Sequence, residues 1–366
     1  MKFEVGRNEF LNALQSVVGV VERRQTMPVL SNFLLDASKE GLMVTGTDLE
    51  LELVSRAQIK TQTPGKVTVP ARKLFDIVRS LPEGATLTLD GGADRVTLKS
   101  GKSRFSLSAM KPEEFPALSA ASSGRALKLP RKALRELLDR TQFAMAQQDV
   151  RYYLNGLLLH VTPKRLRAVA TDGHRLALSE ISQDSKLKDE VQVIVPRKAV
   201  LELLRLLDNS DEVVELRLGE GQIQIDLDSV RMTSKLIDGR FPDYERVIPE
   251  DSDRRVTAQR ERVRQALARV TPVTNDKFRG VRLQLAENQL RLSAKNQEQD
   301  EGEDEIEVSY SGPALEIGFN VNYLIDALSA MQGESFTMDF KGSDSSGLIQ
   351  EVGGGHSKYV VMPMRI

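Results

Sequence analysis

The sequence contains no cysteine and only three histidines among its 366 residues. Without cysteine the chain can form no disulfide, no thiolate nucleophile and no cysteine-ligated metal site. His160, His174 and His356 are scattered along the chain and offer no poly-histidine metal centre. No run approaches the roughly 18 uninterrupted apolar residues of a membrane-spanning helix, and the first residues include no apolar signal segment. We therefore expect a cytoplasmic protein without a metal or other cofactor.

Composition and total charge seem at first to exclude a nucleic-acid partner. With 40% hydrophobic and 28% charged residues, the chain has the composition of an ordinary soluble globular protein. Lys and Arg total 51 against 52 Asp and Glu, which gives a formal net charge of −1. A near-neutral total by itself argues against binding a polyanion. The placement of these charges along the chain reverses that inference.

A helix pattern repeats three times along the chain. Largely apolar quartets at positions i, i+3, i+4 and i+7, the spacing of one face of an amphipathic helix, recur six times. The odd quartets begin at Phe10, Leu134 and Val263, and the even quartets at Leu74, Val200 and Leu324. The dipeptides Thr47-Asp48 and Thr171-Asp172 are separated by 124 residues, a spacing similar to that between successive odd quartets. Two helices therefore recur in each unit of about 125 residues.

The regions between these helices read as strands. We predict helices over 7–20, 71–81, 130–146, 196–207, 259–271 and 319–331. Short alternating runs between them, such as 86–89 and 223–227, are typical of strands, about eight per unit. The fold class is thus α+β, with three repeated domains that each pack two helices on antiparallel sheets. Linkers rich in small or polar residues place the domains at 1–125, 126–252 and 253–366.

The predicted helices carry most of the positive charge. In chain order their net charges are 0, +2, +2, +2, +3 and −1, a total of +8 that leaves −9 for the rest of the chain. The basic side chains lie largely off the apolar stripes, so we expect them to face outward when the stripes are buried. Any solvent-facing helix surface is charged, but that does not explain one sign on four helices of six. A basic surface without base-reading motifs predicts sequence-independent contact with duplex phosphates.

Opposite charges also gather at two distant points of the sequence. The segment 298–307 holds seven acidic residues in ten, whereas Lys99, Lys102 and Arg104 stand just before Phe105 and Leu107. The two segments could meet head to tail between two copies of the chain. A solvated acidic loop is an equally good explanation of the acidic run.

Four motifs resemble one bacterial family. They are Asp149-Val150-Arg151-Tyr152-Tyr153-Leu154-Asn155-Gly156, Ala170-Thr171-Asp172-Gly173-His174-Arg175-Leu176, Asp238-Gly239-Arg240-Phe241-Pro242-Asp243-Tyr244 and Tyr359-Val360-Val361-Met362-Pro363-Met364-Arg365. In this order they are similar to the bacterial DNA polymerase III β sliding clamps, and the resemblance extends over the whole chain. It implies a homodimer of the DNA clamp fold, closed head to tail into a ring around sequence-independent double-stranded DNA. Such a ring is non-catalytic and confers processivity.

The resemblance also implies a DNA-binding set. Its members are Arg24, Arg72, Gln148, Arg151, Tyr152 and Tyr153. The two tyrosines suit base stacking on single-stranded template. Without the resemblance, they read more simply as ordinary strand residues.

A second implied surface is an apolar pocket that receives short clamp-binding peptides. The implied partners are the DNA polymerase III alpha subunit, the clamp loader, other polymerases, ligase and mismatch-repair proteins. The pocket wall comprises Leu154, Thr171, Gly173, His174, Arg175, Leu176, Pro242, Arg246, Val247, Ser346, Val360, Met362, Pro363, Met364 and Arg365. Adaptable methionines would suit several partners. Asp344 departs from the family, which often has an apolar residue there, so this side of the pocket is expected to be more polar.

For the dimer interface, the resemblance points to two groups of residues. Lys73, Arg104, Phe105 and Leu107 of one copy would face Pro272, Val273, Glu301, Glu303 and Asp304 of the other. Pro272 departs from the purely aliphatic contact of the family, so the strength of closure is open.

Two other functions compete with the clamp. Asp172 and His174 could suggest acid–base or metal chemistry, but the chain has no nucleophile elbow, phosphate-binding glycine loop or paired-histidine motif. A monomeric adaptor that uses only the pocket would fit the pocket motifs, although it would leave the basic helices unexplained.

Overall fold

The computed structural model describes residues 1–22, 27–116, 118, 124–185, 187, 189–250, 252–275, 277–353 and 355–365. Contacts group the chain into two compact units rather than three consecutive blocks. Unit 1 comprises Met1–Lys132 and Leu201–Leu236, and unit 2 comprises Ala133–Val200 and Ile237–Ile366. The proposed division at 125 and 252 remains a prediction.

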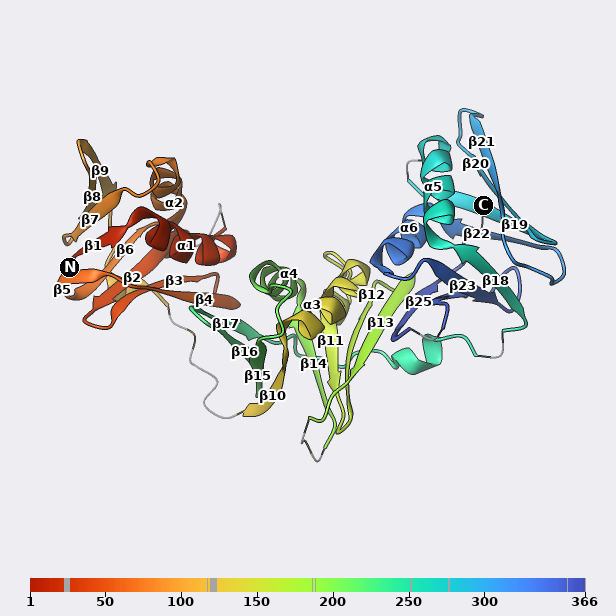
Figure 1. Cartoon of the computed structure of the whole chain (residues 1–366), viewed down its shortest axis with the longest axis horizontal. Helices are drawn as coiled ribbons and strands as arrows, with labels where there is room; N and C mark the ends of the chain where they lie inside the picture. The colour runs from red at the N-terminus through yellow and green to blue at the C-terminus, as the bar shows by residue number, and fades with distance from the viewer. Residues whose placement is uncertain are drawn as a thin grey trace. The chain divides into compact units, whose positions relative to one another are not determined.

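Six α-helices in the described residues follow the predicted pattern (Figure 1). They are α1 (Arg7–Val17), α2 (Ala71–Ser80), α3 (Arg131–Asp139), α4 (Arg197–Leu206), α5 (Arg260–Val270) and α6 (Val321–Ala330). The predicted helix over 130–146 is too long. After Asp139 the chain leaves the α-helix, and a short 3-10 helix follows at Gln142–Ala144, because the Thr141 hydroxyl donates back to the Leu137 carbonyl at 2.7 Å.

Unit 1 holds two antiparallel sheets. The smaller has the order β5 (Lys60–Thr63), β1 (Lys2–Gly6), β7 (Thr86–Gly91), β8 (Arg95–Ser100) and β9 (Ser103–Ser108). The larger has the order β10 (Gly124–Pro130), β15 (Val213–Gly219), β16 (Gln222–Leu227), β17 (Val230–Lys235), β4 (Leu51–Ala57), β3 (Gly41–Thr47), β2 (Asn32–Ser38) and β6 (Gly65–Pro70). In the larger sheet, β17 of the second sequence repeat pairs with β4 of the first, with Ser234 opposite Leu51.

Unit 2 is built in the same way. Its larger sheet has the order β14 (Val191–Pro196), β11 (Gly156–Val161), β12 (Arg165–Thr171), β13 (Arg175–Ser182), β25 (Ser357–Val361), β24 (Gly347–Glu351), β23 (Ser335–Phe340) and β18 (Arg254–Gln259). Its smaller sheet has the order β21 (Glu301–Glu307), β20 (Gln289–Lys295), β19 (Gly280–Ala286) and β22 (Leu315–Asn320). Here β13 of the second repeat pairs with β25 of the third. Two sequence repeats thus share each large sheet, which explains why contacts do not separate the chain into three blocks.

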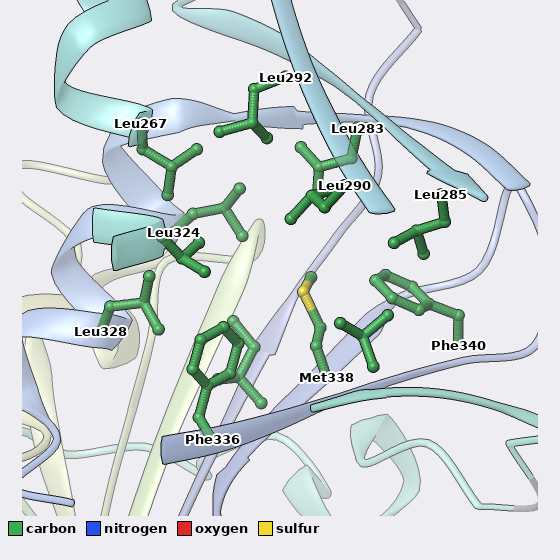
Figure 2. A pocket seen from close by; sticks show the side chains of 13 residues that line it. Leu267, Leu283, Leu285, Leu290, Leu292, Leu324, Leu328, Phe336, Met338 and Phe340 are labelled. Atoms are coloured by element: carbon green, nitrogen blue, oxygen red, sulfur yellow. The ribbon is translucent and has the colours of Figure 1, made fainter. Parts of the chain in front are cut away.

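The apolar stripes of the helices form the core, as the quartets predicted. Every quartet member is buried except Ile77 and Leu204, which are half-buried. In unit 2 the stripes of α5 and α6 face the two sheets across a wholly apolar core, where Leu267, Leu324 and Phe336 point inward (Figure 2). The cavity among these side chains measures only about 20 Å³, so this core is close-packed.

Arg131 departs from the expected outward orientation of the basic helix residues. This side chain is buried and forms ion pairs with Asp208, Glu212 and Asp228 at 2.7–3.3 Å. A buried arginine is retained only where carboxylates compensate its charge, and periodicity alone does not reveal them. The basic helix residues that are exposed are Arg72, Lys73, Arg79, Lys132, Arg205, Arg262 and Arg269. Within the described part of the chain, no helix has the length and apolar character needed to cross a membrane.

Candidate functional site

A tight turn joins β12 to β13 at the motif Thr171–Leu176. The Thr171 hydroxyl donates to the Arg175 carbonyl at 2.6 Å, and one oxygen of Asp172 accepts the amides of His174 and Arg175 at 2.9 and 3.0 Å. Gly173 has φ +88°, a left-handed conformation that costs glycine little. The Asp172 carboxylate thus shapes the turn, which is a structural role.

The guanidinium of Arg175 fixes this turn to the rest of unit 2. It donates to Asp172 at 3.0 Å, to Asp326 at 2.5 Å and to the Phe143 carbonyl at 2.8 Å. It also lies 4.4 Å from the ring centroid of Tyr323, within cation–π range. The side chain is only 13% exposed. Arg175 therefore acts through its protein contacts as an anchor under the turn.

The C-terminal segment runs beside the turn. Leu176 of β13 stands opposite Val360 of β25 in the antiparallel register. Beyond β25, the Met362 amide donates to the His174 carbonyl and the Met364 amide to the Gly318 carbonyl, each at 2.9 Å. These bonds bring the second and fourth family-like motifs, separated by about 190 residues in sequence, into one surface.

An apolar cluster underlies this surface. Its buried members are Leu158, Val169, Leu176, Leu178, Ile194, Phe241, Tyr244, Leu348 and Val360, and Tyr153, Ile237, Val247 and Ile248 pack against it half-buried. Val247 belongs to a one-turn 3-10 helix, η6 (Tyr244–Val247). The turn, η6 and the C-terminal strand thus meet at one partly covered apolar cluster, where a peptide side chain could be buried.

The predicted pocket residues differ in exposure. Leu154, Thr171, Leu176 and Val360 are buried; Gly173, Arg175, Val247, Ser346, Pro363 and Met364 are half-buried; His174, Pro242, Arg246, Met362 and Arg365 are exposed. Met362 exposes 38% of its surface, which is unusual for a methionine. Asp344 is exposed in the loop between β23 and β24, and its effect on peptide preference remains a prediction.

A cavity of about 260 Å³ lies beside the C-terminal segment. Met364 and Arg365 line it together with Asn275, Phe278, Gly280 and Lys295. Phe278 is 52% exposed, and Lys277 stacks over its ring at 5.4 Å. Sequence reasoning missed Phe278, because exposure of a single aromatic has no signature in periodicity.

The predicted DNA-contacting residues of unit 2 lie in the segment before β11. Tyr152 is 57% exposed and packs edge-on against Tyr153, which is half-buried against the apolar cluster. Gln148 has φ +56°. Arg151 donates to both oxygens of Asp149 and to the Asp172 carbonyl. These hydrogen bonds hold the pKa of Asp149 at about 2, so the pair is ionised at neutral pH.

The remaining DNA-contact predictions involve unit 1. The Arg72 guanidinium is exposed on α2 and donates to the Val21 carbonyl at 2.7 Å. Arg24 lies outside the described residues.

Six of the nine predicted dimer residues lie on the outermost strands of two sheets. In unit 1, β9 ends its sheet; Arg104 on it is exposed, Phe105 and Leu107 are half-buried, and Lys73 is exposed on α2. In unit 2, β21 ends its sheet and carries the acidic residues. Each strand therefore has one edge without a strand partner among the described residues.

Part of the acidic charge on β21 is compensated inside unit 2. Asp304 accepts from Arg269 at 2.6 Å, Glu301 pairs with Lys295 at 2.5 Å, and Glu303 pairs with Arg291. Next to this strand, Pro272 is exposed and Val273 half-buried. The Val273 side chain lies directly over Gly302, where a Cβ atom would come within 2.5 Å of it.

Family models match nearly the whole chain. Residues 1–119 match the N-terminal domain of the DNA polymerase III beta subunit, 128–243 the central domain and 245–365 the C-terminal domain. The chain belongs to the DNA polymerase III beta subunit family. The beta sliding clamp of Pseudomonas putida is 50% identical and that of Escherichia coli K12 46% identical, each over 100% of both chains. The predicted family, clamp fold and DNA sliding clamp function are thus confirmed.

Solved clamp structures show the same fold. The DNA polymerase III subunit beta from Pseudomonas aeruginosa superposes with a TM-score of 0.97 at 47% identity, over 100% of both chains. The sliding clamp from Bartonella birtlesii bound to griselimycin gives a TM-score of 0.97 at 38% identity, also over 100% of both chains. The Pseudomonas aeruginosa clamp has likewise been solved bound to griselimycin.

Proposed function

We propose that two copies of this sliding clamp close head to tail into a ring that encircles double-stranded DNA and slides along it. The two sheet edges carry this proposal. The outer edge of β9 presents Arg104 beside Phe105 and Leu107, and the outer edge of β21 presents an acidic row. Antiparallel pairing of such edges would bury apolar side chains, satisfy backbone groups and match opposite charges.

The DNA contact is electrostatic and independent of sequence. Exposed arginines and lysines on α2, α3, α4 and α5 would neutralise phosphates without reading base edges. The exposed ring of Tyr152 would add stacking on unpaired template bases. The proposed DNA-contact set remains Arg24, Arg72, Gln148, Arg151, Tyr152 and Tyr153. In this role the protein holds DNA by topology and catalyses no reaction, and it acts in the cytoplasm.

A peptide site in unit 2 would tether partner proteins to the ring. Its proposed base is the cluster around Leu176, Val247 and Val360, and its continuation is the cavity beside Met364 and Arg365. The proposed occupants are short peptides of the DNA polymerase III alpha subunit, the clamp loader, other polymerases, ligase and mismatch-repair proteins. Griselimycin, which is bound in the solved structures of two relatives, is a suitable probe for this proposed site.

Encirclement of DNA can be tested by comparing retention of the protein on circular and on linear DNA. Protein loaded onto nicked circular DNA by a clamp loader should survive a salt wash and be lost when the DNA is linearised. Equal retention on both DNA forms would contradict encirclement. Light scattering should give the mass of a dimer, whereas a persistent monomer would favour the adaptor alternative.

The peptide site is tested by mutation. Leu176→Ala should weaken griselimycin binding at least tenfold, because it removes buried apolar surface from the cluster, and should leave the dimer intact. Unchanged binding in calorimetry would place the site elsewhere.

A further inference from the structure

The short helix η6 is too short to be stable without tertiary contacts. It has four residues, and the Ile248 amide closes its end with a 3.3 Å bond to the Glu245 carbonyl. A single turn of 3-10 helix is not stable in isolation, since nucleation fixes several dihedrals for one hydrogen bond. Its place on unit 2 must therefore come from tertiary contacts.

Three polar contacts attach η6 to the large sheet of unit 2. The Tyr244 hydroxyl lies 2.6 Å from Nδ1 of His160 on β11, and it accepts from Arg167 on β12 at 3.0 Å. Arg167 also donates to Glu245 of η6 at 2.6 Å and to Glu180 of β13 at 2.8 Å. We call Tyr244, His160 and Arg167 the latch.

The register of the sheet places His160 and Arg167, the two latch residues on its strands, side by side. His160 stands opposite Arg167, and Arg167 opposite Glu180, in two successive antiparallel pairings. Side chains at directly opposed positions share a face of the sheet. Neighbouring strands therefore present a row of polar groups to one buried tyrosine.

Donor chemistry fixes the direction of each bond. Arginine can only donate, so the Tyr244 oxygen accepts from Arg167 and its own proton is free for His160. Burial raises the pKa of Tyr244, so this proton is retained at neutral pH. The Tyr244 hydroxyl then donates to Nδ1 of His160, and Nε2 of the same ring lies 2.6 Å from a carboxylate oxygen of Glu190.

We infer that the latch holds η6 in place and is therefore a set of positioning residues for the peptide site. The same turn that Tyr244 anchors carries Val247 onto the apolar cluster and Arg246 at its exposed rim. Releasing Tyr244 lowers the fraction of molecules with Val247 in position, and the apparent affinity for a peptide falls by that fraction. The link to affinity rests on the proposed peptide site, whereas the link to the order of η6 does not.

The test combines hydrogen exchange with binding. In Tyr244→Phe the bonds to His160 and from Arg167 are both lost, and we expect amide exchange of 241–250 to quicken and the Kd for griselimycin to rise, each at least about tenfold. His160→Leu should behave like Tyr244→Phe. His160→Asn keeps an acceptor near the position of Nδ1 and should stay within about threefold of the wild type.

A matched control separates positioning from loss of stability. The Tyr310 hydroxyl donates to the Pro313 carbonyl at 2.5 Å, so Tyr310→Phe likewise removes a tyrosine hydroxyl and its hydrogen bonding in unit 2, but not at η6. It should leave both readouts unchanged. If Tyr244→Phe matches Tyr310→Phe in exchange and affinity, the latch is refuted; faster exchange with unchanged affinity would refute its link to the site. If the wild-type protein does not bind griselimycin, the proposed peptide site fails, and exchange alone still decides whether the latch orders η6.

Discussion

Replacing Arg175 by alanine should destabilise the protein strongly although the residue lies at the surface turn of a binding site. The change removes bonds to Asp172, Asp326 and the Phe143 carbonyl, together with the stacking on Tyr323. Breaking a buried ion pair typically costs 3–5 kcal/mol, because the partner charge is left uncompensated. Asp326 is 42% exposed and can recover water, so we expect a loss of about 2–4 kcal/mol in the free energy of unfolding.

The assay is urea unfolding followed by circular dichroism, with two companion variants. Arg175→Lys keeps the charge but cannot bridge two carboxylates and should lose an intermediate amount. Arg246→Ala is the matched control, since this side chain is 86% exposed and pairs with the half-exposed Asp243, so its loss should stay within about 0.5 kcal/mol. A loss for Arg175→Ala no larger than that of Arg246→Ala would refute the anchoring role.

Three further predictions follow from single contacts. Leu267→Ala should cost about 2–5 kcal/mol in urea unfolding, because it enlarges a cavity in a fully apolar core. In Arg151→Ala the pKa of Asp149 should rise from about 2 towards its usual value, as measured by NMR titration. Because the pKa of Asp149 is depressed in the folded protein, the stability that this carboxylate contributes is present above its unfolded pKa. That contribution is lost as the pH falls through about 2. Gly173→Ala should destabilise more than Gly84→Ala in thermal unfolding; both sites have positive φ, but only at Gly173 would a Cβ meet another group, the Arg151 guanidinium at 2.9 Å. An equal loss at the two glycines would show that backbone strain alone acts.

Much of the fold could be predicted from periodicity. The quartet that begins at Phe10 and the quartet that begins at Val263 both mark the buried face of a helix, and the structure begins and ends these helices within a few residues of the prediction. The error at the end of α3 arose from Thr141. Its side chain continues the buried stripe, but its hydroxyl competes for the helix carbonyls.

The candidate site was predictable mainly through its motifs. Thr171 and Asp172 recur at Thr47 and Asp48, and both pairs build the same turn, in which the threonine hydroxyl bonds the carbonyl four residues later. Phe278 and the latch residue His160 had no such signal. Their roles depend on neighbours that lie far away in the sequence.

The threefold repeat, the six amphipathic helices and the separation of basic helices from an acidic remainder could all be read from residue order, because period and charge are local properties. The three-dimensional fold was needed to show that strands of successive repeats pair within one sheet, β4 with β17 and β13 with β25. The fold was also needed to show which arginines are exposed and which, like Arg131 and Arg175, are held by carboxylates. Long-range strand pairing and charge compensation depend on which distant residues meet, and local patterns do not encode that.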